Sequence, residues 1–348
     1  MTLTEAFRHQ AISCAALGSP FMGQLLNILA ENWPSDSALA KKFEGFEGDI
    51  GPAGHSLPLR TAGGLHALVL SGQDEGLAQV YPPNTPTDAA LRDAVLAAFE
   101  THAAFLLDWT DSPPQTNEVR RSAALIAGAH VAAQYFDLPI QLSELGASGG
   151  MNLMWDHYAL AVGGAQFGPA APALVLSPEW TGALPPARAP QIAERAGVDL
   201  NPLNPKRADH LLRLTAYLWP DQPHRLALTR AAAAVMDAPI DKGDAVEWLE
   251  GRLGAAAEGR LHLIQHSVAW QYFPDAVQHR GREMIEAAGA KATPDRPLGW
   301  LSMESDGDTT GGKGAAITLR LWPGDITLHL GRADFHGRWI AWHHPAEG

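Results

Sequence analysis

The sequence predicts an α/β protein, with a mainly helical region at about residues 1–115 and a domain built on a parallel sheet at 116–348. Helical patterns dominate the first part of the chain. From residue 140 onward, strand-like apolar runs alternate with helical segments, the pattern of a parallel sheet. Near the end, two runs that alternate apolar and polar residues flank a turn, which predicts an antiparallel hairpin.

The first helix is predicted to begin after Thr2, because Thr2 and Glu5 have the spacing of a capping box. Its apolar face is expected to carry four residues: Phe7, Ile12, Ala15 and Ala16. A second helix is predicted over 21–32, ended by Trp33-Pro34. Residues 44–65 are rich in Gly and Pro and predict an irregular loop, followed by a short apolar run at 65–70.

Two longer helices are predicted next. Thr87 or Asp88 caps an amphipathic helix that continues to Trp109, where Asp111-Ser-Pro-Pro114 ends it. An Ala-rich helix over 117–136 suits close packing against a sheet.

The predicted strands of the sheet are 140–145, 196–200, 260–266 and 298–304. A Pro- and Gly-rich segment at 163–190 predicts an insertion between the first two. The terminal hairpin pairs 317–321 with 326–330, because Trp322-Pro-Gly-Asp325 has the composition of a turn.

Composition restricts the partners. The net charge of -13 argues against nucleic acid, since an acidic surface repels phosphates and the only basic cluster is Arg120-Arg121. A single cysteine, Cys14, excludes an intrachain disulfide and a multi-cysteine metal site. No signal peptide or membrane-spanning run is found, so we expect a cytoplasmic protein that does not contact a membrane. The oligomeric state is not indicated.

The segment Glu144-Leu-Gly-Ala-Ser-Gly-Gly150 is the most informative of the chain. A predicted strand ends in an acid, passes through small residues and enters a run that predicts a helix. Small residues let a ligand approach the backbone, and N–H groups at a helix start favour anions or polar cofactor atoms. This turn therefore predicts a nucleotide-type cofactor site.

The same segment resembles the first motif of Rossmann-like S-adenosylmethionine-dependent methyltransferases, with Ser148 in place of the middle glycine. Gly197-Val-Asp-Leu-Asn-Pro202 is similar to their second motif, Lys242-Gly-Asp-Ala245 to the third, and residues 261–270 to the fourth strand and its loop. The resemblance covers residues 138–345. One departure is that 55 positions separate Glu144 from Asp199, against roughly 20 in dinucleotide-binding folds.

This resemblance implies a Rossmann-like sheet, S-adenosylmethionine as cofactor and a small-molecule acceptor. The cofactor-binding residues that it implies are Glu144, Gly146, Ala147, Ser148, Gly150, Asn152, Asp199, Leu200, Asp244, Ala245 and His266. Residues after the fourth strand and at the end of the next share the carboxyl edge of the sheet, where open α/β folds bind ligands. The candidate catalytic residues there are His266, Gln271, Tyr272 and Glu304, with Trp270 as a pocket wall.

Over most of its length the chain resembles a bacterial family known only as domain of unknown function 2332. The segments that carry this resemblance are 116–121, 144–153, 195–202, 217–222 and 266–272. The family supplies no reaction.

Two different functions also fit the sequence. The chain is consistent with a non-catalytic ligand-binding or structural protein on the same fold. Gly146-Ala-Ser-Gly-Gly150 formally matches the nucleophile elbow of serine hydrolases, with Ser148 as nucleophile, His336 as base and Asp244 or Asp275 as acid. Asn117, Glu118 and Arg121 could line the pocket, although a helix dipole explains Glu118.

No metal site is predicted. His262 and His266 share a strand face, but four residues of strand place their Cα atoms ~13 Å apart. His343-His344 and Asp156-His157 lack a third ligand nearby in sequence. The run at 307–314 nearly matches a P-loop but precedes a strand, so it is rejected as a phosphate site.

Overall fold

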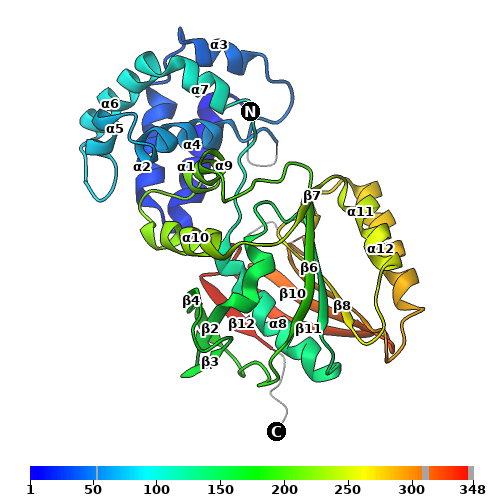
Figure 1. Ribbon diagram of the computed structural model, residues 1–348. Helices are drawn as coiled ribbons and strands as arrows, with labels where there is room; N and C mark the ends of the chain where they lie inside the picture. The colour runs from blue at the N-terminus through cyan, green and yellow to red at the C-terminus, as the bar shows by residue number, and fades with distance from the viewer. Residues whose placement is uncertain (52–53, 308–312, 344–348) are drawn as a thin grey trace. The chain divides into compact units, whose positions relative to one another are not determined.

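The computed structural model describes residues 1–51, 54–307 and 313–343 (Figure 1). It divides into two compact units. The helical unit consists of Met1–Thr116 and Arg207–Ala227, and the sheet unit of Asn117–Lys206 and Leu228–Gly348. Residues 207–227, which the sequence division assigns to the second domain, thus cluster with the first unit.

The helices of the helical unit are α1 (Leu3–Ala16), α2 (Pro20–Glu31), α3 (Ala38–Glu44), α4 (Leu57–Leu70), α5 (Glu75–Val80), α6 (Asp88–Thr101), α7 (Ala103–Trp109) and α9 (Ala208–Ala216). The predicted capping box of α1 is confirmed, since Thr2 Oγ1 accepts from Glu5 N and Glu5 Oε2 accepts from Thr2 N. Thr87 caps α6, since its Oγ1 accepts from Ala90 N at 3.2 Å. The predicted apolar face of α1 is wrong except at Phe7, because Ile12, Ala15 and Ala16 are exposed.

Two other helix predictions were wrong in their boundaries. The predicted loop at 44–65 contains the first half of α4, because Gly63 and Gly64 allow close packing: added Cβ atoms would lie 2.4 Å from Tyr217 and 2.9 Å from Leu106. The single helix predicted up to Trp109 is broken at His102, which leaves helical geometry between α6 and α7.

The sheet unit contains a nine-stranded sheet in the order β5-β12-β11-β10-β9-β8-β1-β6-β7. Its strands are β1 (Ile140–Leu145), β5 (Glu179–Thr181), β6 (Ile192–Asp199), β7 (Ile240–Lys242), β8 (Leu261–Ser267), β9 (Leu298–Glu304), β10 (Ala315–Trp322), β11 (Ile326–Ala333) and β12 (Trp339–Trp342). The five strands from β9 to β7 are parallel. The predicted hairpin is confirmed as β10 and β11, which pair antiparallel.

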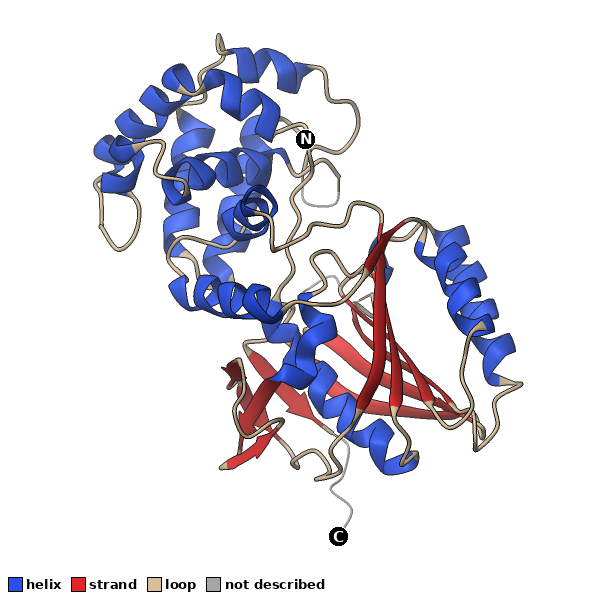
Figure 2. Cartoon of the chain, in the orientation of Figure 1, coloured by secondary structure: helices blue, strands red, loops and turns tan. Residues whose placement is uncertain are grey.

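Helices cover both faces of this sheet (Figure 2). Helix α8 (Ser122–Tyr135) packs on one face, where Gly128 lies so close to Leu301 that a Cβ would be 2.5 Å from its Cδ1. Helices α11 (Ala245–Gly254) and α12 (Asp275–Gly289) pack on the other. Side chains of each strand alternate between the α8 face and the α11/α12 face.

The predicted insertion at 163–190 has structure of its own. A three-stranded sheet, β3-β2-β4, is made of β2 (Tyr158–Val162), β3 (Ala165–Phe167) and β4 (Leu174–Leu176), and β5 pairs with β12 at the edge of the large sheet. Helix α10 (Pro223–Val235) runs across the division between the units.

The helix predicted after the Gly-rich turn is wrong in type. The turn leads into a 3-10 segment, η2 (Met151–His157), and then into β2. The carbonyl of Met151 accepts the Tyr158 hydroxyl at 2.7 Å, and Asn117 Oδ1 accepts from Met151 N at 2.9 Å. These side-chain bonds stabilise the short segment without α-helical bonding.

Among the described residues, no helix is both long enough and apolar enough to cross a membrane.

Candidate functional site

The carboxyl ends of β1, β6, β8 and β9 lie at one edge of the sheet and carry Glu144, Asp199, His266 and Glu304. Strand register separates these residues by face. Glu144 pairs with Gln265, whereas His266 pairs with Ser302. Because neighbouring positions of a strand point to opposite faces, Glu144 points to the α8 face and His266 to the α11/α12 face.

The Gly-rich turn, residues 146–150, follows β1 at this edge of the sheet. Gly146, Ser148 and Gly150 have φ values of 69°, 54° and 72°, the left-handed region that favours glycine. A Cβ on Gly146 would lie 2.6 Å from Ala269 Cβ, and one on Gly150 would lie 2.5 Å from Met236 Cε. Small residues therefore allow this turn to pack against the loop after β8 and the segment before β7.

Asp199, the predicted ribose ligand, holds this turn in place. Its Oδ2 accepts from Ser148 N and its Oδ1 from Asn201 N, both at 2.8 Å. Ala147 and Ser148 are buried, while Leu200, the next residue of the predicted motif, is 72% exposed. The structure thus brings the first and second motifs together through a direct hydrogen bond.

Glu144 is buried on the α8 face, and its Oε2 has no hydrogen-bond partner in the described part of the chain. Burial raises the pKa of Glu144 to about 8, although the Gln265 side chain and the positive charge of Arg121 act in the other direction. The carboxyl is therefore mainly protonated at neutral pH.

Gln265, the neighbour of Glu144 in the sheet, belongs to a network of buried polar side chains. Asn152 Oδ1 accepts from Ser122 Oγ at 2.7 Å, and its carbonyl accepts from Gln265 Nε2 at 3.1 Å. Gln265 Oε1 in turn accepts from Trp155 Nε1 at 3.0 Å. Asn152, a predicted cofactor ligand, thus fixes η2 against α8 and β8.

His266 forms the centre of a second cluster, which we call the His266 cluster: His266, Trp270, Trp300 and Glu304. His266 Nδ1 lies 2.7 Å from Glu304 Oε1, and Trp300 Nε1 donates to His266 Nε2 at 2.8 Å. An indole N–H can only donate, so Nε2 accepts and Nδ1 carries the proton. The imidazole also stacks on Trp270, with ring centroids 5.1 Å apart. Both nitrogens of this predicted base therefore bond to protein groups.

Glu304 organises the loop after β8. Its Oε1 accepts from Ala269 N at 2.9 Å and Trp270 N at 3.1 Å, and its Oε2 from Gln271 N at 3.4 Å. Burial acts to raise the pKa of Glu304, but the bonds from His266 and these backbone groups hold it below its ordinary value. Glu304 is thus an ionised carboxylate that holds the short segment η3 (Trp270–Tyr272).

The remaining predicted residues have separate locations. Gln271 Oε1 accepts from Ser305 N at 3.0 Å, and Tyr272 is 69% exposed. Asp244 caps α11 by accepting from Val246 N and Glu247 N, and also accepts from Arg280 at 3.2 Å. Ala245 is buried as the first residue of α11.

The sequence did not single out Gln265 and Trp300, which complete the two clusters. Gln265 carried a usable signal, because a polar side chain in a central strand of a parallel sheet is buried and needs partners. No signal in the sequence indicated Trp300, because its hydrogen bond to His266 depends on the register between β8 and β9.

A serine hydrolase triad and a metal site gain no support from the described residues. Asp244, one predicted acid of the triad, bonds to α11 and Arg280, and Asp275, the other, lies in the first turn of α12. Within the described ranges, no group of three or more His, Cys, Asp or Glu residues could hold a metal ion. Most of the rejected P-loop match, 308–312, and His344 lie outside the described residues.

Comparison with known proteins identifies one family. The family described as "Uncharacterized protein conserved in bacteria (DUF2332)" matches residues 4–342. The chain therefore belongs to this family, and the family predicted from the sequence is confirmed. No curated protein and no solved structure matches the chain.

Proposed function

We propose that this family member binds S-adenosylmethionine at the carboxyl edge of its parallel strands and acts as a methyltransferase-like protein on a small molecule. The observation that carries the proposal is the strand order β7-β6-β1-β8-β9, with the Gly-rich turn leaving β1. This is a doubly wound order whose direction reverses beside β1. Ligands of open α/β sheets bind outside the strand ends at such a point.

Glu144 provides the best fit for this ligand. A buried carboxyl oxygen without a partner is costly, and the ligand would satisfy it by placing a polar or positive group beside it. The cofactor supplies an electrophilic methyl group when bound. A neutral Glu144 donates a hydrogen bond, and it ionises if a cationic amine approaches, because an opposite charge lowers a carboxyl pKa.

Exposed apolar side chains at the same edge support a ligand surface. Leu200 follows β6 and Tyr272 follows β8, and the exposed fractions of their side chains are large for apolar residues. These residues, with Gly146 between their strands, would contact the ligand. The His266 cluster then positions the loop 268–272 against the turn instead of transferring protons.

The geometry also favours a second candidate, a ligand-binding protein without catalysis. Of the groups able to act as acid or base at this edge, His266, Asp199 and Glu304 are each bonded to other protein groups, and Glu144 is the exception. Methyl transfer requires mainly that the reactants are oriented, so these hydrogen bonds do not distinguish a methyltransferase from a protein that only binds the ligand. Binding with no turnover of any acceptor would select the second.

Titration calorimetry with S-adenosylmethionine and S-adenosylhomocysteine tests the proposal. We expect dissociation constants of about 1–100 μM. Gly146→Ala should weaken binding at least about tenfold, because the new Cβ displaces the turn from Ala269. Gly164→Ala is the matched control, since Gly164 also has a positive φ, 78°, but no heavy atom within 4 Å of the added Cβ. No heat with either ligand at about 1 mM would refute the proposal.

A further inference from the structure

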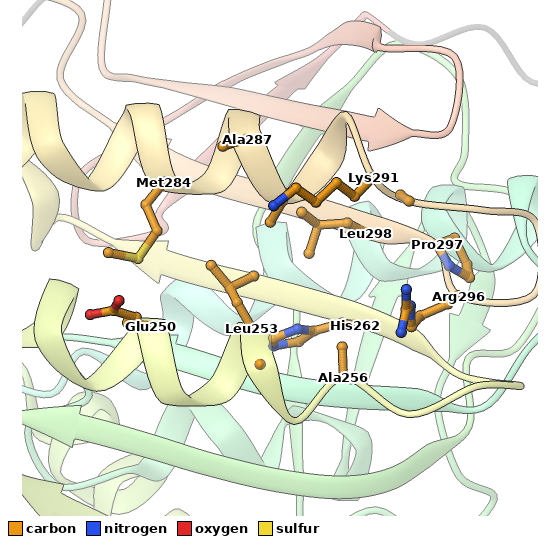
Figure 3. A pocket seen from close by; sticks show the side chains of 13 residues that line it. Glu250, Leu253, Ala256, His262, Met284, Ala287, Lys291, Arg296, Pro297 and Leu298 are labelled. Carbon is orange, nitrogen blue, oxygen red and sulfur yellow. The ribbon is translucent and has the colours of Figure 1, made fainter.

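A pocket of about 440 Å³ lies at the opposite edge of the sheet, where β8 and β9 begin (Figure 3). The end of α11, the last turns of α12 and the segment before β9 surround it. Its apolar lining consists of Leu253, Ala256, Met284, Ala287, Ala288, Ala292 and Leu298. This volume falls in the range of small-molecule sites, about 300–1,000 Å³.

His262 adds a buried polar group to the lining. It is 1% exposed, and its Nε2 lies 2.9 Å from Ser143 Oγ, which also accepts from Arg252 Nε at 3.1 Å. Its Nδ1 has no hydrogen-bond partner within the described residues. Burial, together with the charge of Arg252, lowers the pKa of His262 to about 3, so the ring is neutral. A buried nitrogen without a partner indicates a ligand atom or a water there.

Charged groups give the pocket polarity. Figure 3 shows Arg296 toward one end of the pocket and Glu250 toward the other, with the Lys291 side chain extending to the middle. No ion pair of Lys291 or Arg296 occurs in the described part of the chain, although the protein carries an excess of 13 negative charges. Both side chains are exposed, so an external anion can reach them.

We propose that this pocket binds a small monocarboxylate with an unbranched apolar chain. The carboxylate contacts Lys291 and Arg296, and the chain lies on Leu253, Met284 and Leu298. Glu250 at the far end repels a second carboxylate, so a dicarboxylate of the same length is disfavoured. This site is independent of the carboxyl edge proposed above.

Titration of the whole protein with octanoate and with octanedioate tests this inference by calorimetry or ligand-observed NMR. We expect octanoate to bind with a dissociation constant of about 0.1–1 mM and octanedioate at least about tenfold more weakly. The double variant Lys291→Gln/Arg296→Gln should weaken octanoate at least about tenfold. Arg230→Gln, which removes an exposed charge from α10, serves as a control that retains affinity.

Three outcomes would overturn the inference: no octanoate binding up to about 10 mM, equal affinity for both acids, or unchanged affinity in the double variant. Thermal unfolding of each variant confirms that it is folded. Gly146→Ala should leave octanoate binding intact. A failure of the octanoate site can therefore be distinguished from a failure of the proposed S-adenosylmethionine site at the carboxyl edge.

Discussion

Replacing Glu144 with Gln should stabilise the protein at neutral pH and remove much of the dependence of its stability on pH. In the unfolded chain this carboxyl loses its proton near its ordinary pKa of 4.5, whereas in the folded protein burial raises that pKa to about 8. Between pH 4.5 and pH 8 the folded protein therefore keeps a proton on Glu144 that the unfolded chain has lost. The contribution of this carboxyl to the free energy of unfolding is complete below pH 4.5 and is lost as the pH rises toward 8. At pH 8 the free energy of unfolding should be lower than below pH 4.5 by on the order of 3–5 kcal/mol from this carboxyl alone.

Urea unfolding at pH 5 and pH 8 measures this effect. The free energy of unfolding of the unmodified protein should decrease between the two values more than that of Glu144→Gln. Glu247→Gln is the control, because Glu247 is exposed on α11 of the same unit. An equal pH dependence in Glu144→Gln and the unmodified protein would show that Glu144 titrates normally.

Replacing Glu304 with Ala should destabilise the sheet unit by about 3–5 kcal/mol. The substitution leaves His266 Nδ1 and the N–H groups of Ala269 and Trp270 without their acceptor, in a buried loop. Glu304→Gln should cost less, since its amide oxygen still accepts hydrogen bonds.

Urea unfolding monitored by tryptophan fluorescence is suited to this test, because Trp270 and Trp300 lie in the same cluster. Glu247→Ala provides an exposed control on the same unit. A loss of less than about 1 kcal/mol in Glu304→Ala would mean that the loop after β8 does not depend on this carboxylate.

The sequence predicted the mixed α/β fold, and the structure confirms its helical first part, its mostly parallel sheet and its terminal hairpin. Strands β1 and β9 have the predicted bounds because each is an apolar run ended by an acid and a polar or glycine-rich turn. The short strands β2, β3, β4, β5, β7 and β12 were missed. Runs of three to five residues carry too little alternation for detection, and their pairing depends on other strands.

The sequence placed the candidate residues Glu144, Asp199, His266 and Glu304 at the carboxyl edge of the sheet, where the structure has them, but it did not indicate their faces. Sequence predicts that side chains of a strand alternate between the two faces of the sheet. Which positions point to which face depends on the register of that strand with its neighbours. Glu144 and His266 were consequently grouped, although they point to opposite faces. Asp199 and Asp244 bond to backbone groups of the turn and of α11, which sequence spacing alone could not reveal.

Hydrogen–deuterium exchange with and without S-adenosylhomocysteine tests the central claim most directly, because it locates the ligand. A site at the carboxyl edge predicts slower exchange in peptides covering 144–150 and 266–272, with no change in 250–262 and 284–298 at the opposite edge. Unchanged exchange at saturating ligand, or protection confined to other peptides, would contradict a cofactor site at the Gly-rich turn.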